Sequence, residues 1–257
     1  EDAIEVDVVE ICKKIRNDDD NSITPVIVVS SDGDKEHRID ILKESIEYYI
    51  KKPVNEKYLY YTVKNLNRLM NINRRISPLT GLPGNVQIHA ELKKRLLNKE
   101  DFCVLYLDLD NFKAYNDVYG FLKGDQIITF TSEVILNCVH KNYAEGTFVG
   151  HIGGDDFIAI VPGINCEKLC QDVITNFDEK VLSFFTPEDV QKGYIEVENR
   201  KGIIEQFPLT SISIGVVVVE PNRFYNILEI GEVGAQVKHA AKSVVGSSYA
   251  IDKRMPK

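Results

Sequence analysis

The sequence has no hydrophobic run of the length that a membrane-spanning helix requires. Its longest apolar stretch, ISIGVVVV at residues 212–219, has the length and the β-branched composition of a buried strand. The pattern of a secretory signal peptide is also missing, because the sequence begins with an acidic segment at Glu1 and Asp2. We therefore expect a cytoplasmic protein without a membrane partner.

Paired cysteines and an excess of positive charge are likewise missing. The five cysteines are an odd number scattered through apolar runs, which predicts reduced thiols rather than a disulfide framework. The net charge of −8 argues against a general nucleic-acid-binding protein. It leaves a nucleotide substrate open, because metal ions and local lysines can neutralise phosphates. The length of 257 residues favours one or two domains.

Residues 148–161, FVGHIGGDDFIAIV, predict a β-hairpin closed by a Gly-Gly-Asp-Asp turn. Gly153 and Gly154 permit the positive φ angles that such a turn usually needs. The turn presents Asp155 and Asp156 side by side, and two adjacent carboxylates repel each other unless a cation lies between them. Taken alone, such a pattern is more often a solvated turn than a metal site.

A second acidic cluster ends a predicted buried strand at residues 102–110, FCVLYLDLD. Its acids, Asp108 and Asp110, are costly to bury unpaired, so they either cap a loop or hold a hard cation. Polar residues and glycines follow at short offsets in residues 111–125, NFKAYNDVYGFLKGD. Two acidic clusters on strand-like sequence suit Mg²⁺, which binds one or two carboxylates together with substrate phosphates.

Five segments, in order and spacing, resemble the GGDEF domain of diguanylate cyclases. They are SPLTGLPGN (77–85), DLDNFKAYNDVYGFLKGD (108–125), GHIGGDDF (150–157), LTSISIGV (209–216) and AAK (240–242). The resemblance implies an α/β (α+β) fold: a palm-like domain whose mostly antiparallel central sheet is flanked by helices. It also implies a nucleotidyltransferase that joins two GTP molecules into cyclic di-GMP and releases two pyrophosphates.

The same resemblance assigns metal binding and catalysis to the acidic clusters. Asp108, the backbone carbonyl of Leu109 and Asp156 would hold two Mg²⁺ ions per active site, or Mn²⁺ in their place. Asp156 would also act as general base, with Asp155 beside it as a second catalytic carboxylate.

The resemblance further implies a GTP site. Its residues are Phe112, Lys113, Asn116, Asp117, Asp125 and Lys242. Asn116 and Asp125 match residues that hydrogen-bond guanine, and the two lysines match contacts to phosphate. The alternatives left open are a turn residue at Asn116, a helix N-cap at Asp125 and solvated surface lysines. A cyclase for mixed cyclic dinucleotides is disfavoured, since Asp125 retains the guanine-selective carboxylate.

Several positions depart from the family pattern. Asp156 replaces the usual Glu, whose side chain is one methylene longer, and His151 replaces a frequent arginine before the two glycines. An arginine expected after Lys242 is missing. Ala144 and Thr147 stand where the family has the Arg and Asp of its inhibitory product site. The alternative function is therefore a catalytically weak or inactive GGDEF domain that binds GTP or a partner protein.

Residues 1–54 predict a separate α/β unit with alternating helices and strands, an order typical of a parallel sheet. Helices are expected within 6–16 and 36–44, and strands at 25–31 and 45–51. The unit resembles the C-terminal half of a flavodoxin-like response-regulator receiver domain. The matching hydroxyl, aromatic and lysine positions are Ser30, Tyr49 and Lys52.

On this alignment the phosphoacceptor aspartate would lie before Glu1. Half of a doubly wound sheet would leave an exposed edge and an uncovered apolar face. A complete receiver would make a histidine kinase the partner and would place the cyclase under its control. The alternative is a small α/β cap without a signalling role.

A helical linker is predicted at residues 55–76, before the GGDEF-like region at 77–257. Its apolar stripe has 4-3-4 spacing and consists of Leu59, Val63, Leu66 and Met70. The stripe either packs on the adjoining sheet or pairs with a second chain, and its short length leaves both open. A homodimer is also expected from the reaction, because each GGDEF unit would hold one GTP and two are needed.

Overall fold

The computed structural model describes residues 7–17, 24–31, 35–73, 76–198 and 202–252. The chain divides into two compact units, residues 1–72 and 73–257. The finer division at residues 54 and 76 into receiver-like unit, linker and GGDEF-like region remains a prediction. No helix within the described ranges combines the length and the apolar character needed to cross a membrane.

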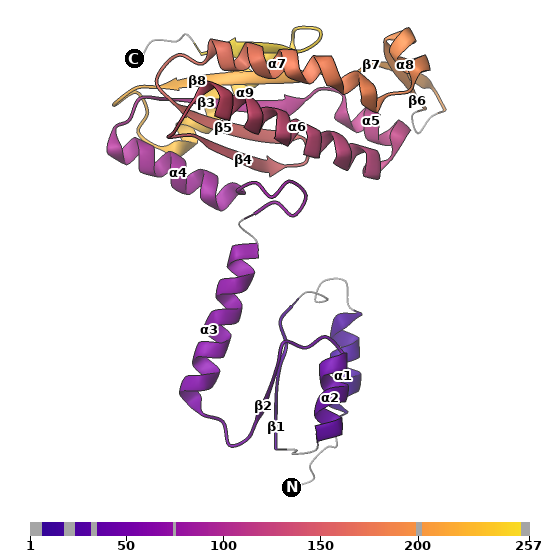
Figure 1. The fold of residues 1–257 in the computed structure, drawn as a ribbon, viewed down its shortest axis with the longest axis vertical. Coiled ribbons are helices and arrows are strands. Elements are labelled where there is room, and N and C mark those ends of the chain that lie inside the picture. Colours follow the sequence, from indigo (N-terminus) through magenta and orange to yellow (C-terminus); the bar gives the residue numbers. More distant parts are fainter. Residues whose placement is uncertain (1–6, 18–23, 32–34, 74–75, 199–201, 253–257) are drawn as a thin grey trace. The chain divides into compact units, whose positions relative to one another are not determined.

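The first unit is built around two parallel strands (Figure 1). Its elements are α1 (Val8–Arg16), β1 (Ile27–Ser30), α2 (Lys35–Lys43), β2 (Tyr48–Lys51) and α3 (Glu56–Asn73). The alternation of helices and strands and the parallel pairing agree with the sequence-based expectation. The second strand begins three residues later than predicted, because Ser45 adopts a positive φ of 58° and the backbone turns there.

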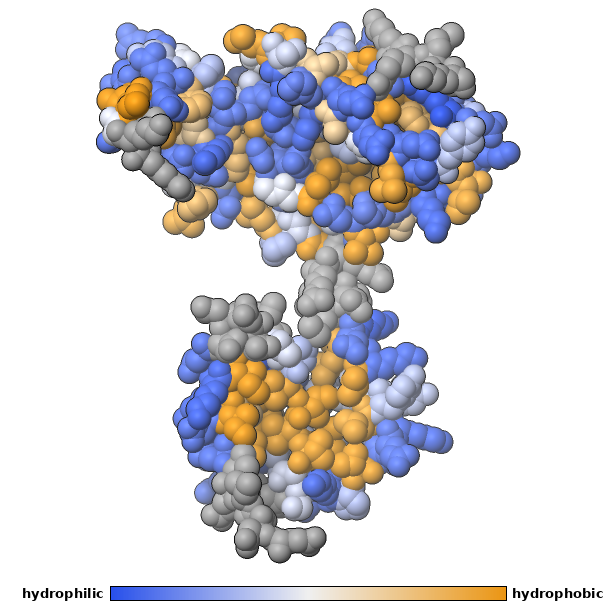
Figure 2. Space-filling view, turned by 180° about the vertical axis from the view of Figure 1, so that it is seen from behind, coloured by the Kyte–Doolittle hydropathy of each residue, from blue (hydrophilic) through white to orange (hydrophobic). Residues whose placement is uncertain are grey.

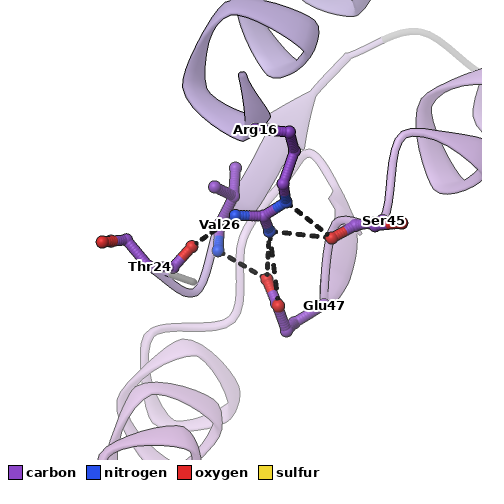
Figure 3. A network of polar contacts seen from close by, with 5 residues as sticks. All are labelled: Arg16, Thr24, Val26, Ser45 and Glu47. Atoms are coloured by element: carbon purple, nitrogen blue, oxygen red, sulfur yellow. Dashed lines mark hydrogen bonds and ion pairs between the residues drawn. The ribbon is translucent and has the colours of Figure 1, made fainter. Parts of the chain in front are cut away.

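Arg16, at the end of α1, links the segments of the first unit (Figure 3). Its guanidinium donates to the carbonyl oxygen of Thr24 at 2.7 Å and to that of Ser45 at 2.7 and 3.0 Å. It also pairs with Glu47 at 3.0 Å, and the Glu47 carboxylate accepts from the backbone N–H of Val26 at 2.6 Å. The three nitrogens of one planar group thus join α1 to the segments that precede β1 and β2.

One face of the first unit is strongly apolar (Figure 2). Its buried core is small: Cys12, Val28, Ile41 and Ile46 form one cluster, and Ile50 is also buried. Exposed apolar side chains of this unit include Ile11, Val29, Ile39, Leu42, Val63 and Leu69. Such a face is what half of a doubly wound sheet leaves uncovered. The receiver identity of the unit remains a prediction.

The second unit contains a five-stranded sheet in the order β4-β5-β3-β8-β9 and a separate β6–β7 hairpin. Its elements are α4 (Asn85–Asn98), β3 (Phe102–Leu109), α5 (Phe112–Tyr119), α6 (Phe121–Asn142), β4 (Phe148–Gly153), β5 (Asp156–Pro162), α7 (Glu167–Val181), the 3₁₀ helix η1 (Leu182–Phe184), α8 (Pro187–Lys192), β6 (Tyr194–Glu198), β7 (Ile204–Pro208), β8 (Ile212–Val219), α9 (Ile227–Lys242) and β9 (Ser248–Ile251). The sheet is mixed rather than mostly antiparallel, because β9 pairs in parallel with β8. The physical reason is the crossover through α9, which returns the chain in the direction of β8.

Side chains of the central strand β3 belong to two separate hydrophobic clusters. Leu105 and Leu107 belong to the larger core with side chains of α6 and α7. Val104 and Tyr106 point the other way and pack with α4 and α9. Because both faces are covered, residues 102–109 are almost continuously apolar instead of alternating with polar residues.

Two glycines bring α9 close to the sheet. A Cβ on Gly234 would lie 2.2 Å from the Tyr106 ring, and one on Gly215 would lie 2.4 Å from the backbone nitrogen of Lys238. Gly215 is paired with Tyr106 across β8 and β3. The backbone of α9 at Lys238 therefore rests directly on β8, one strand away from β3.

Candidate functional site

Two carboxylates lie opposite each other across the β3–β5 pairing. Asp108 stands one residue before the end of β3, and Asp156 is the first residue of β5. The turn before Asp156 has positive φ angles of 144° at Gly153 and 58° at Gly154, as its sequence predicted. Asp108 is buried, whereas Asp156 is partly exposed. The structure thus brings together the acids of two distant segments.

Two lysines of α9 contact these carboxylates. The Nζ atom of Lys238 lies 2.8 Å from Oδ1 of Asp108 and also donates to Oδ1 of Asp156. Lys242 follows one helical turn later and forms an ion pair, without hydrogen-bond geometry, with Oδ2 of Asp108. Two ammonium groups therefore face two carboxylates, and their charges balance.

The lysines and burial act in opposite directions on the acids. Burial raises the pKa of Asp108, but the ammonium groups of Lys238 and Lys242 outweigh it and hold the pKa below its ordinary value. Burial raises the pKa of Asp156 in spite of Lys238. Burial also raises the pKa of Asp155, and the nearby Asp108 charge adds to that effect.

The oxygen atoms of Asp108 and Asp156 are the type of ligand that a hard divalent cation prefers, and the backbone carbonyl of Leu109 follows Asp108 directly in the chain. Within the described parts of the chain, no three His, Cys, Asp or Glu side chains are grouped as a metal site. A bound metal ion would therefore take further ligands from water or from phosphates. Asp110 does not join the pair, because its carboxylate accepts hydrogen bonds from Ser211 and Ser213, each at 2.8 Å.

Asp125 lines a cleft of about 490 Å³. The other walls come from the loop before α4 and the start of that helix (residues 76–79 and 84–86), from Ile128 of α6 and from residues 151–154 at the Gly-Gly turn. Asp125 lies inside α6, whose N-cap is Gly120, so the N-cap alternative for Asp125 is wrong.

Asn116 lies on α5 and packs against Gly124, the neighbour of Asp125. A Cβ on Gly124 would lie 1.9 Å from Oδ1 of Asn116. That oxygen is buried and has no hydrogen-bond partner, which costs free energy. Asn116 is part of a helix rather than of a turn, so the turn alternative is also wrong.

The remaining predicted substrate residues lie elsewhere. Lys113 and Asp117 line a larger cleft of about 1120 Å³ between α5 and the β6–β7 hairpin. Phe112 is buried and stacks on Tyr115 at 6.5 Å between ring centroids. The structure thus joins Lys242 to the carboxylates, while Lys113 and Asp117 line a cleft that contains neither the carboxylates nor Asp125.

Comparison with known proteins identifies the family of this arrangement. The sequence profile described as "Diguanylate cyclase, GGDEF domain" matches residues 76–232. The chain belongs to the GGDEF family. Diguanylate cyclase DgcZ of Escherichia coli K12 is 34% identical over 145 residues, which cover 54% of this chain and 46% of DgcZ. The probable diguanylate cyclase DgcT of the same organism is 26% identical over 195 residues, covering 73% of this chain and 39% of DgcT.

The chain spans less than half the length of these relatives. A solved structure of a diguanylate cyclase/phosphodiesterase from Caldicellulosiruptor saccharolyticus superposes with a TM-score of 0.51 at 18% identity. The match covers 71% of this chain and 95% of the other. At this identity the likeness shows the fold alone, a mixed α/β GGDEF domain.

His151 replaces a frequent arginine of the GGDEF family and is built into the wall of the smaller cleft. Its Nε2 lies 3.0 Å from the carbonyl oxygen of Gly154, and its ring stacks on Phe157 at 4.7 Å between centroids. Because a carbonyl only accepts, Nε2 carries the hydrogen, and the Ser77 hydroxyl oxygen lies 2.8 Å from Nδ1. Ala144 and Thr147, two further departures from the family pattern, lie just before β4.

Sequence reasoning missed Lys238 in the GGDEF domain. A signal existed, because Lys238 and Lys242 are four residues apart and therefore share one face of a helix. Lys242 was predicted as a phosphate contact, whereas in this structure it contacts Asp108.

The receiver-like positions belong to the first unit and are described within it. The backbone N–H of Lys52 donates to the carbonyl oxygen of Ser30 at 2.8 Å, so these two residues lie together at the carboxyl ends of β1 and β2. The Arg38 guanidinium lies 5.5 Å from the ring centroid of Tyr49. Their role in phosphorylation remains a prediction.

Proposed function

We propose that this GGDEF protein is a diguanylate cyclase, which condenses two GTP molecules into cyclic di-GMP with loss of two pyrophosphates. The observation that carries the proposal is the pairing of Asp108 with Asp156 at two strand ends, within reach of the α9 lysines. Membership of the family supports the same chemistry.

Each charged group has a role in this proposal. Asp108, the carbonyl of Leu109 and Asp156 would hold the divalent metal ions, Mg²⁺ or Mn²⁺. Such ions, when bound, lower the pKa of a hydroxyl and neutralise a leaving pyrophosphate. Asp156, whose pKa is raised by burial, is suited to accept the proton of the GTP 3′-hydroxyl. Lys242 supplies positive charge toward the phosphates.

Guanine would bind in the cleft lined by Asp125. A volume of about 490 Å³ suits a nucleobase and part of its ribose. The Asp125 carboxylate would accept from the N–H groups of guanine. Asn116, which packs against Gly124 next to Asp125, is the second candidate for the base and would have to turn toward the cleft to reach it. Lys113, Asp117 and Phe112 stay candidates on the resemblance alone.

A homodimer follows from this reaction, since each domain holds one GTP and two must meet. We also propose that the first unit is part of a receiver that a histidine kinase controls. Its parallel strands and the contact between Ser30 and Lys52 at their carboxyl ends support that assignment.

The decisive experiment is incubation of the full chain with GTP and Mg²⁺, followed by mass spectrometry for cyclic di-GMP. We expect product from the wild-type chain and none from Asp156→Asn. Tight GTP binding without product in the wild type would instead favour a nucleotide-binding module, which the shorter Asp156 side chain and its contact with Lys238 also favour.

A further inference from the structure

We propose that the Lys238 ammonium group is an internal counter-cation, which lies between Asp108 and Asp156 and competes with a divalent metal ion for both. This inference rests on the proposed function in one respect: Asp108 and Asp156 are taken as the metal ligands.

Most carboxylate oxygens of Asp108 and Asp156 are already paired with lysine. Lys238 contacts Oδ1 of Asp108 at 2.8 Å and Oδ1 of Asp156, while Lys242 pairs with Oδ2 of Asp108. Three of the four carboxylate oxygens thus face an ammonium group. A divalent cation that approached the same oxygens would meet the repulsion of positive charges only a few ångströms away.

The backbone position of Lys238 is fixed by close packing of α9 on the sheet. Its backbone rests on Gly215 of β8, where no Cβ fits, and Gly234 rests on Tyr106 in the same way one turn earlier. The Lys238 side chain is 22% exposed and that of Asp108 is 6% exposed. Because α9 is anchored at these two points, the ammonium group is tethered near the acids at a high effective concentration.

A bound nucleotide would compete with the two acids for Lys238. Phosphate oxygens accept strong, charge-assisted hydrogen bonds from lysine, so a bound triphosphate competes with the acids for Lys238. Movement of Lys238 to the phosphates would free the carboxylate oxygens for the metal ion. Nucleotide and metal should therefore bind cooperatively, and the coupling is reciprocal. Without nucleotide the acid pair should bind metal weakly.

The test is a titration of the nucleotide-free full chain with Mn²⁺, in which electron paramagnetic resonance measures free Mn²⁺. We expect Lys238→Met to bind Mn²⁺ at least about tenfold more tightly than the wild type, because one nearby positive charge is removed. Lys238→Arg keeps the charge and should resemble the wild type. Lys168→Met, which removes an exposed lysine of α7, controls for net charge and should change nothing.

Equal Mn²⁺ affinity of the wild type and Lys238→Met would overturn the inference. Lys238→Gln repeats the test with a polar neutral side chain if the methionine variant does not fold. Adding Asp108→Asn to Lys238→Met should abolish the gain, and a gain that persists would place the metal elsewhere and also overturn the inference. The proposed function is judged separately by cyclic di-GMP, because Mn²⁺ binding requires no turnover. If cyclic di-GMP forms but Lys238→Met leaves the Mn²⁺ affinity unchanged, only the inference is refuted. If Lys238→Met raises the Mn²⁺ affinity but no cyclic di-GMP forms, only the proposed cyclase activity is refuted.

Discussion

Ser77 and His151 are 74 residues apart in the sequence, yet Oγ of Ser77 lies 2.8 Å from Nδ1 of His151. Thr80 adds a contact of 3.3 Å from its Oγ1 to the same nitrogen. These contacts hold the loop before α4 against the strand that leads into the Gly-Gly turn. Both segments line the cleft with Asp125, so the shape of that cleft depends on one histidine.

Replacing His151 with Phe should loosen this cleft. The variant retains an aromatic ring against Phe157 but leaves the Gly154 carbonyl and the Ser77 hydroxyl without their partner. We expect a loss of about 1–3 kcal/mol in the free energy of unfolding, measured with urea, and weaker GTP binding by calorimetry. Ser77→Ala removes one partner only and should cost less. Wild-type stability and GTP affinity in His151→Phe would contradict this account.

The buried position of Asp108 predicts an unequal effect of the acids on stability. Asp108→Ala removes the carboxylate that pairs with Lys242 and leaves Lys238 with Asp156 alone. The loss should lower the free energy of unfolding by about 1–3 kcal/mol, less than for a fully buried pair because the lysines are partly exposed. Asp155→Ala is the matched control, since Asp155 forms no ion pair among the described residues. It should change stability by no more than about 0.5 kcal/mol. Equal losses in the free energy of unfolding of Asp108→Ala and Asp155→Ala, measured with urea, would show that the ion pairs between Asp108 and the lysines do not stabilise the fold.

Gly124→Ala should impair nucleotide binding more than folding. The added methyl group meets the Asn116 amide and forces that side chain to rotate away from its present place. We expect GTP affinity, measured by calorimetry, to fall about tenfold or more, since a displaced polar group no longer pairs with the base. Gly231→Ala on α9 is the control: nothing lies within 4 Å of its added Cβ, so helix propensity alone should make it neutral or stabilising. Unchanged GTP affinity in Gly124→Ala would remove Asn116 from the base site.

The cysteines should resist labelling in the folded protein. All five are free and buried. Burial raises the pKa of Cys12 and Cys138, and a hydrogen bond to Cys166 together with burial raises that of Cys103. Since the thiolate is the reactive form, a disulfide reagent at pH 8 should label them only after unfolding. Rapid reaction of the native protein would contradict their burial.

The same thiols predict how stability depends on pH. A raised pKa in the folded state keeps the thiols neutral. Below the pKa of an unfolded cysteine, about 8.5, the thiols are neutral in both states and do not change the free energy of unfolding. Above that value the unfolded chain ionises first, so stability should fall as pH rises. Urea unfolding at pH 8 and pH 10 measures the difference, and Cys138→Ala should reduce it.

Local patterns predicted the elements that form the acid pair. The run FCVLYLDL and the hairpin around the Gly-Gly turn are strands in the structure, because a short apolar run and a turn sequence specify both directly. The opposition of Asp108 and Asp156 follows from the pairing of these strands, which a sequence does not state. It was inferred only through resemblance to a family.

Tertiary packing explains what the sequence did not reveal. Lys238 reaches the acids because Gly215 and Gly234 allow α9 to approach the sheet, a contact between segments far apart in the chain. The parallel direction of β9 likewise depends on how α9 crosses the sheet rather than on the residues of β9. Asp125 and Lys113 are close in sequence but line different clefts, because each cleft is completed by a segment that is distant in the chain.

The position of β3 has a consequence for biosynthesis. This strand lies at the centre of the sheet, but its two partners, β5 and β8, both follow it in the chain. A ribosome therefore releases this largely apolar strand long before residues 212–219 exist to cover its second edge. An open edge of this kind pairs readily with other chains. Nascent or prematurely terminated chains that end before β8 should thus aggregate, and the complete domain should depend on chaperones during the interval that β8 takes to emerge.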